Sequence, residues 1–404
     1  MNALQTLWTL DPAVTFLNHG SFGATPRAVL EAQREWQARM EREPVRFFVD
    51  ELDVALGASR AALAPLLHCK ADDLAFVSNA TSGVNTVLRS LSFEPGDELL
   101  CTDHIYPACK NVLDFVASRT GAQIVVAKVP FPCTGPEEVI AAVMGAVSGQ
   151  TRLVLLDQVA SPTGLVFPVP AIVKLLSVQG IDTLVDAAHG PGIVPLNLDD
   201  TGAAYTTGNC HKWMCAPKGC AFLHVRSDRQ THIRPLTISH GATTETNGNK
   251  RFRAEFDWVG TADPSPYLTV PFLNNYMQEQ FGNWDHIMAT NRNLAILGRT
   301  ILCEKLGIEK PCPDSMVAAL ASLPLPKGFD WAGQIPRPAI EVCNRLYQRW
   351  RVEVPIFDWP QPGKQLFRIS AQLYNDEQDY LRLAEVLAGS SLGYVKADCS
   401  ENNQ

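Results

Sequence analysis

The sequence lacks the features of a membrane, secreted or nucleic-acid-binding protein. No apolar run among its 404 residues approaches the roughly 18 needed to span a bilayer. The segment Met1 to Thr15 has neither a basic start nor a long apolar stretch, so we expect no signal peptide. Lys and Arg number 34 against 42 Asp and Glu, which leaves a net charge of −8. This acidic balance argues against nucleic acid or an anionic membrane as the partner.

Cysteine pairs and a dinucleotide-binding turn are also missing. The 11 cysteines are an odd number and include no Cys-x-x-Cys pair. Scattered cysteines in a chain of this length indicate reduced thiols and a cytoplasmic protein rather than a disulfide scaffold. We expect no bound metal. No Gly-x-Gly-x-x-Gly turn follows the first predicted strand, which argues against a nicotinamide-dependent dehydrogenase.

What the sequence does contain is a regular alternation of strand and helix patterns. The run Thr151–Val159 is apolar through its middle, which is typical of a parallel strand buried on both faces. The alternation predicts an α/β fold with a mostly parallel sheet and binding groups at the C-terminal ends of its strands. Strands are predicted at Leu74–Ser78, Glu98–Thr102, Gln123–Val129, Thr151–Val159, Thr183–Asp186 and Cys220–Val225. Helices are predicted from Thr81 and over Pro107–Arg119, Glu137–Val147 and Val169–Gln179.

The alternation ends after about Pro235. The segment Ser239–Trp258 is polar and contains glycine, so we expect a long loop there. Helices are expected at Tyr267–Gln280 and Asn291–Leu306, and a short strand at Leu366–Ile369. This second pattern predicts a smaller C-terminal α/β domain.

Lys212 is the first candidate for chemistry. It lies in Thr206–Trp213, in a turn after a strand and among aromatic and apolar residues. Such surroundings favour the neutral amine by desolvation. A neutral amine can form a Schiff base with an aldehyde cofactor and can later act as a general base. The alternative is a solvated surface lysine.

Asp186 is the second candidate, at the end of an apolar strand in Leu184–Gly190. A carboxylate in that position is costly unless it is paired. A protonated pyridine nitrogen is a suitable partner, because the aspartate keeps the ring an electron sink. A helix cap or an internal ion pair is the alternative.

An anion site is the third candidate, in Ser78–Asn85. Small residues between a strand and a helix expose backbone N–H groups at the helix N-terminus, and Thr81 and Ser82 add hydroxyl donors. Plain helix capping is the alternative.

Together with two further motifs, these segments resemble the class V aminotransferase family, and within it the isopenicillin N epimerase-like branch. The resemblance covers nearly the whole chain and keeps the family's order of motifs. It implies a fold-type I transferase fold, pyridoxal 5′-phosphate (PLP) as cofactor, and a homodimer with the active site at the interface. The motifs are Phe16–Gly23, Asn79–Gly83, Asp186–His189, Asn209–Trp213 and Arg368–Ser370.

The resemblance also implies roles for single residues. Lys212 resembles the Schiff-base lysine and Asp186 the partner of the pyridinium nitrogen. Tyr106 is preferred over His104 as the ring that stacks on the cofactor, and that choice stays open. The other implied contacts are Thr81, Ser82, Asn209 and His211 to the phosphate, His189 and Ser161 to the phenolic oxygen, Thr261 to the partner subunit's phosphate, and Arg368, Asn18 and His19 to the substrate.

The implied domain organisation has three parts. Residues 1–30 form an N-terminal segment that packs on the small domain. Residues 31–270 form the large PLP-binding domain with the mostly parallel sheet, and residues 271–404 form the small C-terminal α/β domain.

Several reactions are open to such a site. All begin with an external aldimine of an α-amino acid and removal of its Cα proton by Lys212. Epimerisation then needs a second acid, for which Tyr106 or His104 is available, and it is the predicted reaction. The alternative is a Cβ–S lyase, since β-elimination can run on Lys212 alone.

Three other functions are disfavoured. Cysteine desulfuration needs a nucleophilic cysteine shortly before Arg368, and Arg351–Phe367 contains none. An aminotransferase is rare in this branch. A non-catalytic PLP-binding protein is disfavoured by the intact Lys212, Asp186 and Arg368.

Overall fold

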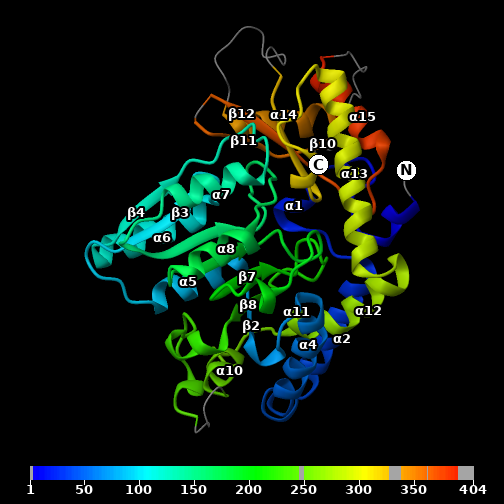
Figure 1. The fold of residues 1–404 in the computed structure, drawn as a ribbon. Coiled ribbons are helices and arrows are strands. Elements are labelled where there is room, and N and C mark those ends of the chain that lie inside the picture. Colours follow the sequence, from blue (N-terminus) through cyan, green and yellow to red (C-terminus); the bar gives the residue numbers. More distant parts are fainter. Residues whose placement is uncertain (1–2, 245–249, 327–337, 362, 390–404) are drawn as a thin grey trace, which may run out of the picture.

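A seven-stranded mixed sheet lies at the centre of the molecule (Figure 1). The computed structural model describes residues 3–244, 250–326, 338–361 and 363–389. The strands are β2 (Leu74–Val77), β3 (Glu98–Thr102), β4 (Gln123–Ala127), β5 (Thr151–Asp157), β6 (Asp182–Ala187), β7 (Tyr205–Asn209) and β8 (Ala221–Val225). Their order is β2-β8-β7-β6-β5-β3-β4. Only the pairings of β8 with β2 and β7 are antiparallel, so the predicted mostly parallel α/β fold is confirmed.

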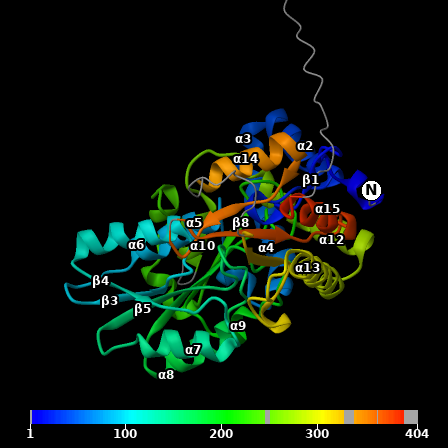
Figure 2. The same cartoon turned by 90° about the horizontal axis from the view of Figure 1, so that it is seen from above.

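Helices cover both faces of this sheet (Figure 2). Strand β5 shows why its sequence is a continuous apolar run. Leu153 and Leu155 belong to the core cluster beneath one pair of helices, while Val154 and Leu156 belong to the cluster beneath the other pair. The first pair is α5 (Ala80–Ser90) and α6 (Pro107–Thr120), and the second is α7 (Pro136–Gly145) and α8 (Val169–Val178).

A second, smaller sheet is built from the C-terminal part of the chain. It has three antiparallel strands in the order β11-β12-β9, and α13 packs against α15 beside it (Figure 1). The N-terminal strand β1 pairs in parallel with β10, which places the first residues of the chain against this region. The predicted domain boundaries at 30 and 270 stay predictions. The elements are β1 (Thr15–Phe16), β9 (Leu320–Pro324), β10 (Val352–Glu353), β11 (Ile356–Asp358), β12 (Gln365–Ser370), α13 (Trp284–Leu306), α14 (Ala339–Trp350) and α15 (Glu377–Leu387).

The remaining helical segments surround the sheet edge at β2 and connect the two sheets. Within the described ranges, no helix combines the length and the apolar character needed to cross a membrane. The longer segments are α2 (Arg27–Arg42), α4 (Leu52–Leu67), α10 (Lys250–Asp257) and α12 (Val270–Phe281). The short ones are η1 (Ala3–Leu7), α1 (His19–Phe22), α3 (Pro44–Arg46), η2 (Phe47–Glu51), η3 (Ala71–Asp73), α9 (Leu198–Thr201), η4 (Ser227–His232), η5 (His240–Ala242), α11 (Ser265–Leu268) and η6 (Asp314–Met316).

The prediction of a long loop over Ser239–Trp258 was wrong, because α10 (Lys250–Asp257) lies within it. Only two apolar side chains hold this helix to the core. Phe252 and Phe256 are four residues apart, both are buried, and their ring centroids lie 4.8 Å apart. A single i,i+4 pair in a charged segment is too weak a periodic signal to distinguish from a loop.

Candidate active site

A cavity of about 530 Å³ opens at the C-terminal edge of the parallel strands. Asp157 and Asn209 are the last residues of β5 and β7, and Asp186 lies one residue before the end of β6. A pocket of this size at this edge suits a cofactor with a small substrate. Nine of the residues predicted from the sequence line it: Thr81, Ser82, Tyr106, Ser161, Asp186, His189, Asn209, His211 and Lys212.

Lys212 is buried in the cavity and contacts His189. Its Nζ lies 3.3 Å from His189 Nε2, while the indole N–H of Trp213 donates to His189 Nδ1 at 3.1 Å. Because Nδ1 accepts, a neutral imidazole carries its proton on Nε2 and donates it toward the lysine. Burial and the positive charge of Arg368 lower the pKa of Lys212 to about 8. The contacts therefore favour an uncharged amine, which is the form that acts as nucleophile and base.

Asp186 is held at the floor of the cavity by two donors. Its Oδ1 accepts from the Ala188 N–H at 2.9 Å, and its Oδ2 accepts from the Cys109 thiol at 3.2 Å. Asp157 is its register partner on the neighbouring strand β5. Burial raises the pKa of both carboxyls, and the negative charge of Asp186 raises the pKa of Asp157 further. We assign the negative charge to Asp186, because donors stabilise it, and the proton to Asp157.

The N-terminus of α5 forms the opposite end of the cavity. Asn79 caps the helix, since its Oδ1 accepts from the Ser82 N–H at 2.8 Å, and Asn209 Oδ1 accepts from the Ala80 N–H at 2.8 Å. Gly83 allows this approach, because a Cβ there would lie 2.1 Å from Thr207 Oγ1 on β7. The amide groups and hydroxyls of this first turn create a positive end for a phosphate.

The N-terminal segment Asn18–Gly23, which is the short helix α1 with its two caps, packs directly on the backbone of the lysine turn. Gly23 has φ +72°, and a Cβ there would lie 2.0 Å from the carbonyl oxygen of His211. His19 is fully buried, and its Nε2 donates to the Lys212 carbonyl at 2.9 Å while its Nδ1 accepts from the Tyr374 hydroxyl at 2.8 Å. This segment therefore positions Lys212 by contacts to the backbone of the lysine turn.

This position of His19 predicts a pH dependence of stability. Burial lowers the pKa of His19 to about 3. Between about pH 6.5 and pH 3 the His19 ring is protonated in the unfolded chain but stays neutral in the folded protein. The stability of the folded protein therefore falls as the pH drops through this range. The unfolding free energy of His19→Gln should therefore depend less steeply on pH than that of wild type. Between roughly pH 6 and pH 4 the two slopes should differ by up to about 1.4 kcal/mol per pH unit. Urea denaturation over a pH series measures this slope. A wild-type slope in His19→Gln would contradict the prediction.

Arg368 on β12 lies behind the cavity wall, 1% exposed. Its Nη1 donates to the Ser161 carbonyl and, at 3.0 Å, to the Ser161 hydroxyl, and its guanidinium lies 5.0 Å from the centroid of the Phe357 ring. Its Nε is buried without a hydrogen-bond partner, and among the described residues no carboxylate lies within ion-pair distance. Burial lowers the pKa of Arg368 to about 10. A buried, unpaired guanidinium next to a cavity calls for an external anion.

The other residues predicted for the site lie outside the lining. His104 is fully buried, with Nδ1 bonded to the Thr163 hydroxyl at 2.9 Å and Nε2 to the Val129 carbonyl at 3.1 Å. Asn18 donates to Glu353 at 3.0 Å. Thr261 is exposed at the surface of the single chain. Of the two candidate stacking rings, Tyr106 is the one in the cavity lining.

Three contributing residues were not singled out from the sequence. Asp157 shares the floor of the cavity with Asp186, Cys109 donates to Asp186, and Trp213 sets the tautomer of His189. Asp157 had a detectable signal, since it directly follows the continuous apolar run Leu153–Leu156 of β5. The Cys109 contact had none, because 77 residues separate it from Asp186.

Comparison with known proteins identifies the family. Residues 17–261, more than half of the chain, match the family model described as aminotransferase class-V. The chain belongs to the class V aminotransferase family. It is 31% identical over 400 residues to a probable chloroplastic L-cysteine desulfhydrase of Arabidopsis thaliana, covering 94% of this chain and 83% of that protein. It is 32% identical over 390 residues to an isopenicillin N epimerase of Streptomyces clavuligerus, covering 94% and 95%.

Solved structures agree with the fold of this family. A complex of the cystine C–S lyase C-DES with its product cysteine persulfide superposes with a TM-score of 0.75 at 22% identity, over 93% of this chain and 97% of that one. A lysine mutant of C-DES, with glycine covalently linked to its PLP cofactor, gives a TM-score of 0.79 at 21% identity, over 95% and 98%. The class V chain described here is a PLP-dependent enzyme.

The residues of the cavity fit PLP in three separate places. The α5 N-terminus offers amide and hydroxyl donors for the phosphate, and Asp186 offers a buried carboxylate for the pyridine nitrogen. Lys212, with its pKa lowered by burial, offers the amine for the aldehyde carbon. Arg368, behind the cavity wall, remains without an acidic partner among the described residues.

Proposed function

We propose that the protein epimerises an α-amino acid at Cα. The observation that carries this proposal is the joint placement of Lys212 and Tyr106 in one cavity beside Arg368. Arg368 binds the substrate carboxylate, Lys212 removes the Cα proton, and the Tyr106 hydroxyl returns a proton to the other face. Bound PLP supplies the electron sink that makes this C–H bond acidic. The similarity to isopenicillin N epimerases supports this reaction.

Tyr106 is suited to proton transfer by its position. It immediately precedes α6 and is 43% exposed, so its hydroxyl can exchange protons with water. Lys212 removes and returns the Cα proton on one face of the substrate, and this alone gives hydrogen exchange without inversion. Epimerisation also needs a proton donor on the other face, and Tyr106 is the proposed donor.

The second candidate is β-elimination from a sulfur-substituted amino acid. It is favoured by the His189–Lys212 contact, because His189 orients Lys212 as a base and elimination needs no second acid on the other face of the substrate. The similarity to L-cysteine desulfhydrases supports it. Desulfuration needs a thiol nucleophile, and among the described lining residues there is no cysteine.

The experiment that separates the two is incubation of the holoenzyme with L- and D-amino acids in deuterated water. Epimerisation gives both enantiomers with deuterium at Cα, whereas elimination gives pyruvate and a released thiol. In Tyr106→Phe we expect the opposite enantiomer to form about 10²–10⁴-fold more slowly, since that variant lacks the second acid. Deuterium uptake into the starting enantiomer should fall by less than about tenfold, because Lys212 is intact.

Tyr276→Phe, a substitution on α12 outside the cavity, is the matched control and should behave as wild type. Equal rates of enantiomer formation in wild type and Tyr106→Phe would contradict the role of Tyr106. Absence of both isotope uptake and thiol release across a broad panel would contradict both reactions.

We further propose a cytoplasmic homodimer that completes the site. Phe22 lines the cavity but is 76% exposed, and Thr261 faces solvent although its motif resembles a phosphate-contacting loop. An aromatic ring left open at the rim of a site is typical of a surface covered by another subunit. The ten described cysteines are free thiols, which supports a reducing compartment. Sedimentation velocity of the holoenzyme measures the oligomeric state.

A further inference from the structure

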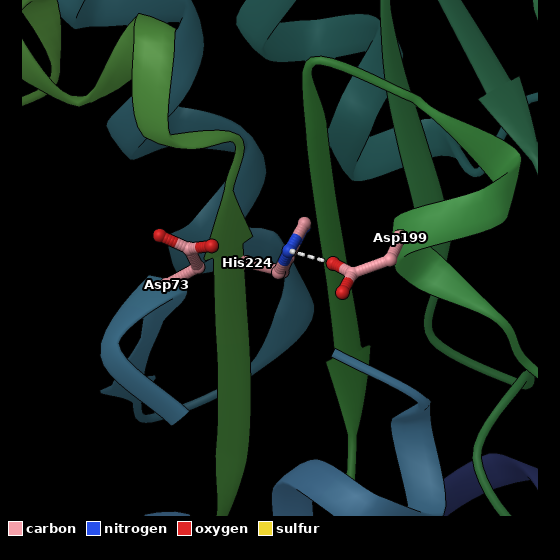
Figure 3. Close-up of side chains that lie close together, drawn as sticks. All are labelled: Asp73, Asp199 and His224. Carbon is pink, nitrogen blue, oxygen red and sulfur yellow. Dashed lines mark ion pairs between the residues drawn. The ribbon is translucent and has the colours of Figure 1, made fainter. Parts of the chain in front are cut away.

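A second cluster of polar side chains lies at the edge of the sheet opposite the cofactor cavity (Figure 3). On β7 the cavity is at Asn209, which pairs with Ala221 at one end of β8. His224, near the other end of β8, pairs with Thr206 and with Leu74 of β2. The cluster consists of His224, Asp73 and Asp199, and its members come from three separate segments of the chain.

His224 is the unusual member of this cluster. It is 2% exposed, and neither of its ring nitrogens has a hydrogen-bond partner. Its Nε2 faces Asp199 Oδ1 at 4.0 Å, which is too long for a hydrogen bond. A buried imidazole normally satisfies its nitrogens, so the unused Nε2 that faces Asp199 indicates a missing ligand at that nitrogen.

The two carboxylates complete a set of ligand atoms. One atom from each of the three side chains lies within 4.8 Å of the others. In a tetrahedral or octahedral zinc-like site with bonds of about 2.1 Å, the ligand atoms lie roughly 3–4 Å apart. Small rotations of the three side chains would bring their ligand atoms to this spacing. The Gln230 amide donates to Asp73 Oδ1 at 2.6 Å and holds that carboxylate, as outer partners of metal ligands do.

The charges around the cluster point to a cation. Among the described residues, no Lys or Arg nitrogen lies within 4.0 Å of either the Asp73 or the Asp199 carboxylate. Asp199 has a half-exposed side chain, so ions and water can reach the cluster from that side. Two carboxylates with one neutral imidazole carry two negative charges, which matches a divalent ion.

We propose that Asp73, Asp199 and His224 bind a divalent transition-metal ion of the zinc class, with water completing its coordination. An imidazole ligand suits such an ion, whereas Ca²⁺ and Mg²⁺ favour oxygen-only sets. The site is structural, because it lies at the sheet edge away from Lys212. It links η3 before β2 to β8 and to α9, whose Asp199 N–H already donates to the His68 carbonyl at 3.2 Å. The proposal is independent of the proposed reaction.

The test uses the PLP-loaded holoenzyme, stripped of metal with a chelator and titrated with Zn²⁺, and with Co²⁺ as a spectroscopic probe. We expect one equivalent to bind and to raise the thermal unfolding midpoint. Co²⁺ should give weak visible bands without the intense near-ultraviolet band of a thiolate ligand, which separates this site from adventitious binding to cysteines. Asp199→Asn, at an accessible position, and His224→Asn should each weaken binding by at least about tenfold.

Asp72→Asn is the matched control, because it removes the same charge one residue away, from a carboxylate that pairs with Arg253 at 2.8 Å. It should bind as wild type does. Asp199→Asn keeps the proposal testable if His224→Asn fails to fold. Equal affinity in wild type and Asp199→Asn, a thiolate band with Co²⁺, or no binding at millimolar metal would each overturn the proposal.

Discussion

Replacement of Lys212 by alanine should abolish the chemistry without unfolding the protein. The variant loses the one lysine amine among the described lining residues, and on the proposed mechanism it therefore loses both covalent capture of the cofactor and the base for the Cα proton. We expect deuterium exchange at Cα to fall by about 10⁴-fold, the upper end for loss of a general base. Because the buried amine is itself costly, the thermal unfolding midpoint of the cofactor-free variant should not fall. Isotope exchange and differential scanning fluorimetry measure the two effects.

Lys218→Ala is the matched control for Lys212→Ala. Lys218 lies six residues further along the same turn and does not line the cavity, so this variant should keep wild-type exchange. A second readout is the rate at which cofactor-free protein takes up PLP. This rate should rise with pH and reach half its maximum near pH 8 rather than 10.5, since only the neutral amine reacts. Exchange near the wild-type rate in Lys212→Ala would remove Lys212 from the mechanism.

Replacement of Arg368 by methionine should impair substrate binding far more than stability. Loss of a buried partner to the substrate carboxylate costs about 2–5 kcal/mol, which corresponds to a roughly 30- to several-thousand-fold fall in kcat/KM, mostly through KM. In the folded protein the variant loses the hydrogen bonds to Ser161 and the guanidinium contact with the Phe357 ring. The unfolding free energy should therefore fall by no more than about 1 kcal/mol, the net worth of an ordinary hydrogen bond. Steady-state kinetics and urea denaturation give both values.

Arg299→Met provides the opposite pattern. Arg299 is as buried as Arg368, but it pairs with Asp314 and donates to the Cys312 carbonyl at 2.9 Å, far from the cavity lining. This control should lose roughly 1.5–3 kcal/mol of stability, the worth of hydrogen bonds to a charged group, and keep the wild-type KM. An Arg368→Met variant with an unchanged KM would show that the substrate carboxylate is held elsewhere.

Much of the site was predictable because its signals are local. Each signal can be recognised within about eight residues of sequence. The three signals are a lysine in a turn after a strand, an aspartate at the end of an apolar strand, and small residues before a helix. The parallel sheet then brings these turns together, since the C-terminal ends of its strands share one edge. This is why nine residues predicted from separate motifs line one cavity.

Other contacts were not predictable because they depend on strand order and side-chain direction. His104 and Tyr106 are two residues apart, and the sequence offers both as the ring that stacks on the cofactor. In the structure His104 is buried in the core, whereas Tyr106 lines the cavity. The thiol of Cys109 reaches Asp186 only because the first turn of α6 lies beside the C-terminal end of β6. Helix α10 was missed because two buried phenylalanines in a charged segment acquire meaning only from the core that they meet.

The sequence by itself determined the α/β class and, through its resemblance to the class V family, the cofactor, because the motifs that carry both are short and local. It also predicts Lys212 as the lysine that binds this cofactor. Only the tertiary structure decided which groups surround that lysine, that Arg368 is buried without a carboxylate, and that His224 meets Asp73 and Asp199. Those contacts join residues up to 207 positions apart. Burial and long-range pairing are properties of the packed sheet and not of any one segment, and they are also what shift the pKa values and leave polar atoms in need of a ligand.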